Sequence, residues 1–124
     1  MKLVLLGEVP SQKNGKQISF NKTTGRRFVR SNDRVIAWKE KAITELRVQF
    51  KGYRITGYPI ALNIVFYYGT HRRKDLDNSA AGVMDALVAA GVIEDDSVQF
   101  ISCLTLQFGG YDKENPRVEI DIED

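Results

Sequence analysis

Residues 60–67 alternate strictly between two faces, and this pattern places a β-strand near the middle of the chain. Ile60, Leu62, Ile64 and Phe66 share one face, because side chains two apart in an extended chain point the same way. The intervening residues form a second face that is apolar enough to be partly covered. Such a strand belongs to a sheet that carries helices.

Two helices are expected, one on each side of this strand in the sequence. The first follows a cap at Ser31 or Asn32 and runs to about Val48, with an apolar stripe formed by Val35, Trp38, Ala42 and Leu46. The second begins at Asn78 or Ser79 and ends before Gly91, and its inward residues are Ala80, Val83, Met84 and Leu87.

Further extended segments are expected at 3–6, 17–20, 26–30, 98–108 and 117–123. Residues 17–20 and 26–30 flank the turn residues 21–25 and predict a hairpin. We expect the last two segments to pair antiparallel. The order of elements favours an α/β or α+β fold in which one mixed sheet carries two main helices.

Composition and charge narrow the class of protein. The chain has 124 residues, of which 43% are hydrophobic, so we expect one small domain over 1–124. Residues 1–50 carry eleven Lys and Arg against four Asp and Glu, whereas residues 51–124 carry seven against twelve. The basic front half is therefore the part expected to face a polyanion, with an ordinary soluble surface as the alternative.

Cys103 is the single cysteine, which excludes an intrachain disulfide and a zinc site built on cysteines. We expect a buried, inert thiol in a reducing compartment. The sequence has no apolar stretch near 18 residues and no signal-peptide pattern, so we expect a cytoplasmic protein with no membrane segment.

Residues 75–96 contain the candidate metal-binding side chains. Asp75 and Asp77 can present two carboxylates together, and oxygen ligands of this kind suit Mg²⁺ or Mn²⁺. The basic run 71–74 precedes them, and carboxylates beside cations suit a phosphate bridged by a metal, as in phosphodiester hydrolysis. A helix of about twelve residues could return the acidic cluster 94–96 to the same place. The alternative is a helix cap and a solvated acidic turn.

Several motifs together resemble one family. They are Gly7-x-x-Pro10-Ser11-x-Lys13-Asn14, Trp38 followed by Ala42, Asp75-Leu76-Asp77-Asn78, Asp85-Ala86-Leu87, Gly91-Val92 and Asp95-Asp96-Ser97. In this order, over most of the chain, they resemble the RusA family of Holliday-junction resolvases, small endodeoxyribonucleases common in prophages. The resemblance implies a two-fold homodimer that makes paired nicks in four-way junction DNA with Mg²⁺, for which Mn²⁺ may substitute. It also implies Asp75, Asp77 and Asp96 as catalytic metal ligands, with Asp95 beside them.

Basic and polar side chains are expected to contact the DNA: Lys13, Asn14, Lys16, Arg26, Arg27, Arg72, Arg73 and Lys74. Family members typically carry a lysine four residues after the second aspartate of the motif, where this chain has Ala81. Either another cation substitutes, with Lys74, Arg73, Lys13 and Lys16 as candidates, or activity is weakened.

Two other classes of function remain open at this point. One is a catalytically impaired protein of the same fold that binds branched DNA, and the other is an interaction module that uses the basic hairpin. Metal-dependent nicking of a synthetic junction separates an enzyme from both.

Overall fold

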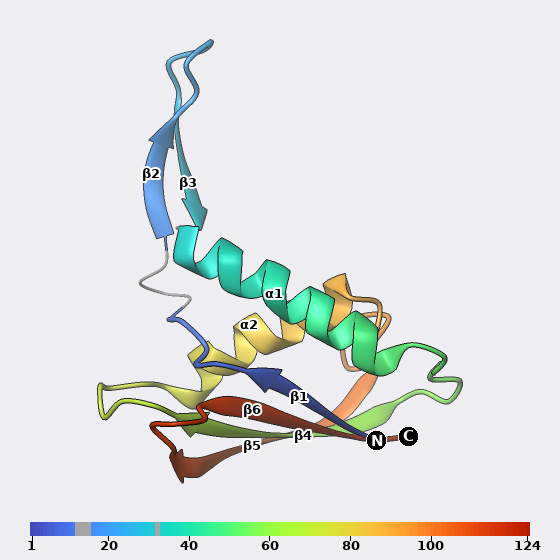
Figure 1. Cartoon of the computed structure of the whole chain (residues 1–124). Helices are drawn as coiled ribbons and strands as arrows, with labels where there is room; N and C mark the ends of the chain where they lie inside the picture. The colour runs from blue at the N-terminus through green and yellow to red at the C-terminus, as the bar shows by residue number, and fades with distance from the viewer. Residues whose placement is uncertain (12–15, 32) are drawn as a thin grey trace.

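The computed structural model describes residues 1–11, 16–31 and 33–124 (Figure 1). The elements follow in the order β1 (Lys2–Leu6), β2 (Lys16–Phe20), β3 (Arg27–Ser31), α1 (Asp33–Phe50), β4 (Ile60–Tyr68), α2 (Leu76–Ala89), β5 (Ile101–Tyr111) and β6 (Arg117–Glu123). Four strands form one mixed sheet in the order β1-β6-β4-β5, and β2 pairs with β3 in a separate hairpin. This is an α+β fold with two main helices, as the sequence predicts.

The core lies between the sheet and the two helices, which cover the same face of the sheet (Figure 1). The alternation in β4 is confirmed, because Ile60, Leu62, Ile64 and Phe66 are each at most 1% exposed. The stripe on α1 is confirmed as well, with Trp38 partly buried and the other three residues fully buried. Full burial of the larger of these side chains, such as Leu46 and Phe66, stabilises the fold by about 1.5–3 kcal/mol each. The alternative cap at Asn32 lies outside the described residues.

The expected pairing between the last two strands is wrong. β6 lies between β1 and β4 and pairs antiparallel with both, whereas β5 pairs parallel with β4. In this position the apolar side chains of β6 meet partners on both sides: Ile120 lies opposite Leu3 in β1 and opposite Ile64 in β4. The central place therefore gives the apolar face of β6 neighbouring strands on both sides, and Val118, Ile120 and Ile122 are each at most 2% exposed.

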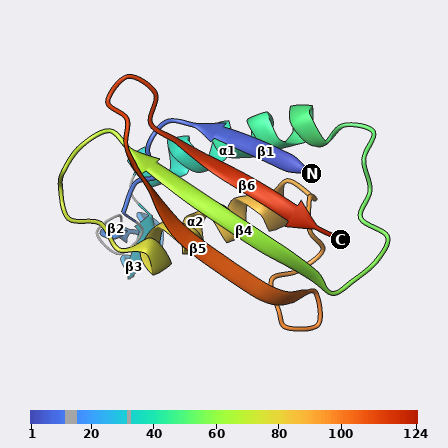
Figure 2. The same ribbon diagram turned by 90° about the horizontal axis from the view of Figure 1, so that it is seen from below.

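β5 forms one edge of the sheet, and it begins three residues later than predicted. Leu104, Phe108 and Tyr111 on this strand are 42%, 50% and 51% exposed. Cys103 is exposed too, so the expectation of a buried thiol is wrong. The reason is its register, since Cys103 pairs with Ala61 and shares with it the face that Figure 2 shows in front of the helices.

Gly109 in β5 provides a test of this packing. A Cβ atom there would lie 2.7 Å from Tyr67 Cε1 and from Val65 Cγ1. The Tyr67 ring cannot easily yield, because Arg117 Cζ lies 3.9 Å from its centroid. We expect Gly109→Ala to lower the free energy of unfolding by about 1–3 kcal/mol, measured by urea denaturation. Gly57→Ala is the control, since its added Cβ meets nothing within 4 Å and its φ is not positive. Equal unfolding midpoints for the two variants would contradict the packing described here.

Candidate active site

The two aspartates of the motif lie at the start of α2, after the loop that follows β4. Asp75 is the N-cap residue of α2, with an extended backbone and no capping hydrogen bond from its side chain, and Asp77 is in the first turn. The helix thus begins two to three residues before the predicted Asn78 or Ser79, because Asp75 can occupy the cap position and Leu76 packs against the core. The two aspartates lie at a helix N-terminus rather than in an extended segment, so the geometry from which a shared face was predicted is absent. Both side chains are exposed.

A cleft of about 720 Å³ opens beside Asp75. Its walls are the segment 8–11 after β1, residues between 70 and 75 before α2, the start of α2, and Arg34 on α1. Asn78 Nδ2 donates a hydrogen bond of 3.1 Å to Ser11 Oγ, which ties the first of these segments to α2. The cleft therefore combines carboxylates, cations and a helix N-terminus, a combination suited to a metal and a phosphate.

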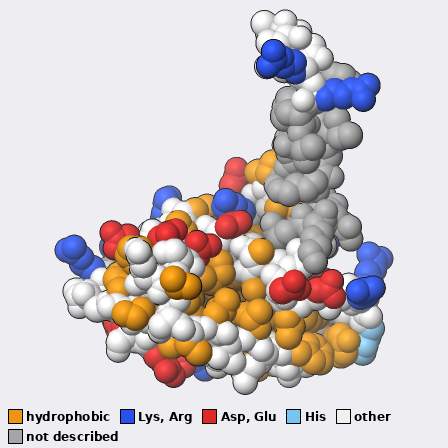
Figure 3. All heavy atoms as spheres, turned by 180° about the vertical axis from the view of Figure 1, so that it is seen from behind, with side chains coloured by type: hydrophobic (Ala, Val, Ile, Leu, Met, Phe, Trp, Pro, Cys, Tyr) orange, Lys and Arg blue, Asp and Glu red, His pale blue; other side chains and the backbone are white. Residues whose placement is uncertain are grey.

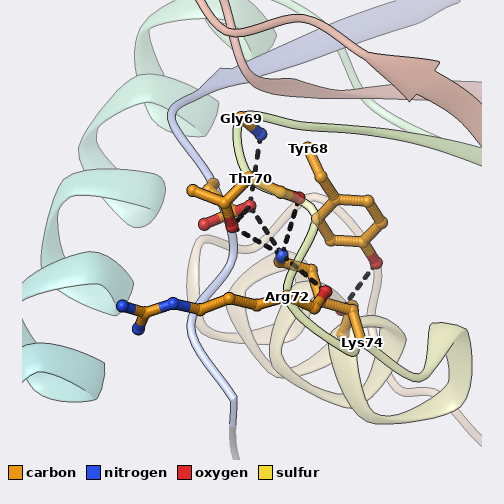
Figure 4. Close-up of polar contacts among 7 residues, drawn as sticks. Tyr68, Gly69, Thr70, Arg72 and Lys74 are labelled. Atoms are coloured by element: carbon orange, nitrogen blue, oxygen red, sulfur yellow. Dashed lines mark hydrogen bonds and ion pairs between the residues drawn. The ribbon is translucent and has the colours of Figure 1, made fainter.

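Lys74 lies inside the loop that lines the cleft, and Figure 4 shows its ammonium among oxygen atoms. Its Nζ donates to Thr70 O at 3.1 Å, to Thr70 Oγ1 at 2.9 Å and to Arg72 O at 3.1 Å. It also forms an ion pair of 3.2 Å with Glu8 Oε1, and its side chain is only 16% exposed. The same Glu8 oxygen accepts the Gly69 N–H at 3.2 Å. The ammonium of Lys74 is therefore occupied by contacts within the protein.

The two arginines beside it behave differently. The Arg72 side chain extends from the loop toward α1, away from the oxygens around Lys74 (Figure 4). Arg73 is 90% exposed, and its Nε lies 3.8 Å from Asp75 Oδ1. The neighbouring His71 ring packs on Tyr111 with 3.7 Å between centroids. Of the four residues 71–74, the arginines are thus the ones that present positive charge at the mouth of the cleft.

The hairpin carries the other predicted DNA-binding residues whose side chains the structure describes. Arg26 and Arg27 are exposed on the hairpin, which projects from the sheet and helices (Figure 1). Lys16 begins β2, while Lys13 and Asn14 lie outside the described residues. Ala81 is exposed on α2.

The acidic turn lies at the opposite end of the sheet from Asp75. Tyr58 OH accepts the Glu94 N–H at 3.2 Å, and the Ile60 N–H donates to Phe100 O at 2.8 Å, so residues 94–100 adjoin the start of β4. Asp75 lies beyond the end of β4, and α2, with 14 residues, spans about 21 Å between the two places. Asp96 is exposed in this turn, and a hydrogen bond from the Ser97 side chain lowers the pKa of the neighbouring Asp95.

The expectation that α2 returns Asp96 to Asp75 and Asp77 is therefore wrong within one copy of the chain. Because β4 and β5 are parallel, the connecting helix must carry the chain back to the other end of the sheet. Accordingly, no three His, Cys, Asp or Glu side chains gather into a metal-binding cluster in the part of the chain that the structure describes. The donor chemistry of Asp75 and Asp77 fits a hard cation, but one copy supplies only part of a ligand set.

Glu8 was not identified from the sequence. Its one signal is that no other acidic residue occurs among the first 32 residues, which are otherwise rich in Lys and Arg. Tyr68 was missed as well: it is 4% exposed, its hydroxyl lies 2.9 Å from Ser79 Oγ, and Lys74 Nζ lies 5.0 Å from its ring centroid. Both residues hold the segment that carries Asp75.

The buried Tyr68 hydroxyl predicts a pH dependence. Burial raises the pKa of Tyr68 above its ordinary value of 10.0, and the charges of Glu8 and Asp75 add to this. The unfolded chain then loses this proton at lower pH than the folded chain, so the free energy of unfolding falls as the pH rises above about 10. We expect Tyr68→Phe to reduce this fall, by up to about 1.4 kcal/mol per pH unit. Tyr53→Phe, at a residue 65% exposed, should keep the wild-type slope, and equal slopes in all three proteins would contradict the assignment.

Comparison with known proteins adds to this geometry. The family described as endodeoxyribonuclease RusA matches residues 9–123. Over 67 residues the chain is 40% identical to the crossover junction endodeoxyribonuclease RusA of Aquifex aeolicus (strain VF5). This matched segment covers 54% of this chain and 52% of that protein. The chain thus matches about half the length of this curated relative. No helix in the described ranges is long and apolar enough to cross a membrane. The chain belongs to the RusA family of endodeoxyribonucleases.

Proposed function

We propose that this chain is a metal-dependent endodeoxyribonuclease that resolves four-way DNA junctions by paired nicks. The observation that carries the proposal is the cleft at the start of α2, which Asp75 and the exposed Arg73 line, with Asp77 in the first turn of the same helix, in a chain of the RusA family. The name of the Aquifex relative, a crossover junction endodeoxyribonuclease, supports a branched DNA substrate.

Asp75 and Asp77 would hold Mg²⁺, for which Mn²⁺ may substitute. When bound, such a cation lowers the pKa of a water molecule and neutralises charge on the phosphate. The protein's own groups orient the substrate: Arg72 and Arg73 attract the DNA backbone to the cleft, and the N-terminus of α2 favours a negative group there. Arg26 and Arg27 on the projecting hairpin would contact phosphates farther away, and the same role for Lys13, Asn14 and Lys16 stays a prediction.

We further propose that Asp96 completes the site from a second copy of the chain. Antiparallel pairing of two β5 edges about a two-fold axis would reverse one strand relative to the other. The start of β5 in one copy, next to Asp96, would then lie at the end of the partner sheet that carries Asp75 and Asp77. An axis perpendicular to the sheet keeps the helices of both copies on the same face, so both groups approach from the same side.

The edge itself supports this dimer. Figure 3 shows hydrophobic side chains gathered along the lower part of the molecule, on the side where β5 forms the sheet edge. The exposed Leu104, Phe108 and Tyr111 belong to this edge, together with Val98 in the preceding turn, which is 85% exposed. An exposed apolar edge strand of this length favours pairing with a strand of another chain. A two-fold dimer would also present two sites to the two-fold symmetric strands of a junction.

A second candidate is a DNA-binding protein of this fold with impaired catalysis. The exposed Ala81 favours this candidate, because the family lysine is absent at that position. Lys74 is not available to replace that lysine, since its ammonium is already bound by oxygen atoms of the protein. Arg73 is then the nearest cation in the sequence to replace that lysine.

Nicking of a synthetic four-way junction tests the proposal. We expect paired, symmetric nicks with Mg²⁺ and none with a chelator. Asp77→Asn should lower the nicking rate at least about 10²-fold, because a ligand charge is lost, and should keep or tighten junction binding, because a charge that repels phosphate is lost too. Glu40→Gln, at an exposed acid on α1, is the matched control and should change neither. Junction binding by the wild type without any nicking would select the impaired alternative.

Mixtures of inactive variants test the shared site. Asp77→Asn and Asp96→Asn should each be inactive, but a mixed dimer would contain one intact site, built from Asp75 and Asp77 of one copy and Asp96 of the other. Subunits mixed by refolding together should recover about a quarter of the wild-type sites and nick one strand per junction. The matched control mixes Asp77→Asn with Asp75→Asn, which leaves no intact site in any dimer. No recovery in the first mixture would rule out a site shared in this way.

A further inference from the structure

The ammonium of Lys74 is bound by four oxygen atoms of the protein, much as a cation is bound in a small cage. Thr70 supplies two of these oxygens, Arg72 one and Glu8 one, at 2.9–3.2 Å. An ammonium has three N–H donors, so these acceptors already use all of them. A DNA phosphate would have to displace one of them from a side chain that is 16% exposed.

The cage also determines the shape of the loop. Because the carbonyls of Thr70 and Arg72 turn inward to Lys74, the loop closes around the ammonium before it enters α2 at Asp75. Glu8 adds a second anchor, since the same carboxylate oxygen accepts the Gly69 N–H at 3.2 Å and pairs with Lys74. Glu8 lies two residues after the end of β1, a strand that does not pair with β4, so it ties the loop to a different part of the fold.

We propose that Lys74 and Glu8 are a positioning pair for the active site and that Lys74 makes no contact with phosphate. The pair holds the loop so that Arg73 faces the DNA and Asp75 stays at the start of α2. This inference rests on the proposed nuclease function for its catalytic consequence. The ordering of the loop does not depend on it and can be tested alone.

The first experiment measures the loop without any DNA. Glu8→Gln removes the ionic anchor and leaves the loop sequence intact, so trypsin cleavage after Arg72 and Arg73 reports only the order of the loop. We expect cleavage at least about tenfold faster than in the wild type, because the open loop becomes more populated. Glu119→Gln is the matched control: Glu119 lies on β6, is 22% exposed and pairs with Arg117 at 3.0 Å, so this variant removes an ion pair of similar exposure that the loop does not contribute to. Equal cleavage in wild type and Glu8→Gln overturns the proposal, whether or not the protein nicks DNA.

The second experiment separates positioning from phosphate contact. A phosphate contact contributes about one to the slope of log binding constant against log salt concentration. We expect Arg73→Ala to lower this slope by about one and Lys74→Met to leave it unchanged. At saturating junction, Lys74→Met should instead lower kcat by about 10- to 100-fold, since small displacements of catalytic groups are costly.

The double variant Glu8→Gln with Lys74→Met should be no slower than Lys74→Met alone, because both substitutions remove the same anchor. A slope lowered by about one in Lys74→Met would assign Lys74 to phosphate and overturn the proposal. Full nicking by Lys74→Met would overturn it as well. If the wild type itself fails to nick, the proposed function is wrong, and the trypsin comparison still decides the positioning pair.

Discussion

The parallel pairing of β4 with β5 is the constraint on which the rest of the site depends. It requires the connecting helix α2 to run back along the sheet, so the residues before and after α2 lie at opposite ends. Asp75 and Asp77 are at one end, and the acidic turn with Asp96 is at the other. The proposed metal site of Asp75, Asp77 and Asp96 therefore needs a second copy in which the direction of the sheet is reversed.

The basic side chains at the cleft have two different roles: Lys74 stabilises the protein, whereas Arg73 is available to contact a substrate. Lys74 is buried deeply enough that each donor must have a protein acceptor, and the acceptors it uses are the carbonyls that shape the loop. Arg73 has the opposite environment, with its side chain 90% exposed. Three consecutive basic residues look equivalent in the sequence, yet only those at the surface can exchange water and counterions for phosphate at low cost.

Much of the fold could be predicted because local patterns decide it. The alternation in β4, the stripe on α1 and the glycine that ends α2, with φ of 78°, each follow from neighbours within a few residues. Strand partners do not: β5 and β6 both alternate, and their own sequences do not distinguish the edge strand from the central one, in which Ile120 lies between Leu3 and Ile64. In the site, the aspartate motif could be identified from the sequence, whereas Glu8 lies 66 residues before Lys74 in the sequence and pairs with it only through the fold.

The edge strand connects stability with catalysis. An exposed apolar edge such as that of β5 favours unwanted association unless another strand or a helix covers it. A two-fold partner would cover it and, by the same antiparallel arrangement, would bring Asp96 to the end of the sheet where the other carboxylates lie. A lone copy could then bind DNA through its arginines and hold at most a partial set of metal ligands. Assembly would thus limit cleavage to the dimer, whose two sites match the symmetry of a four-way junction.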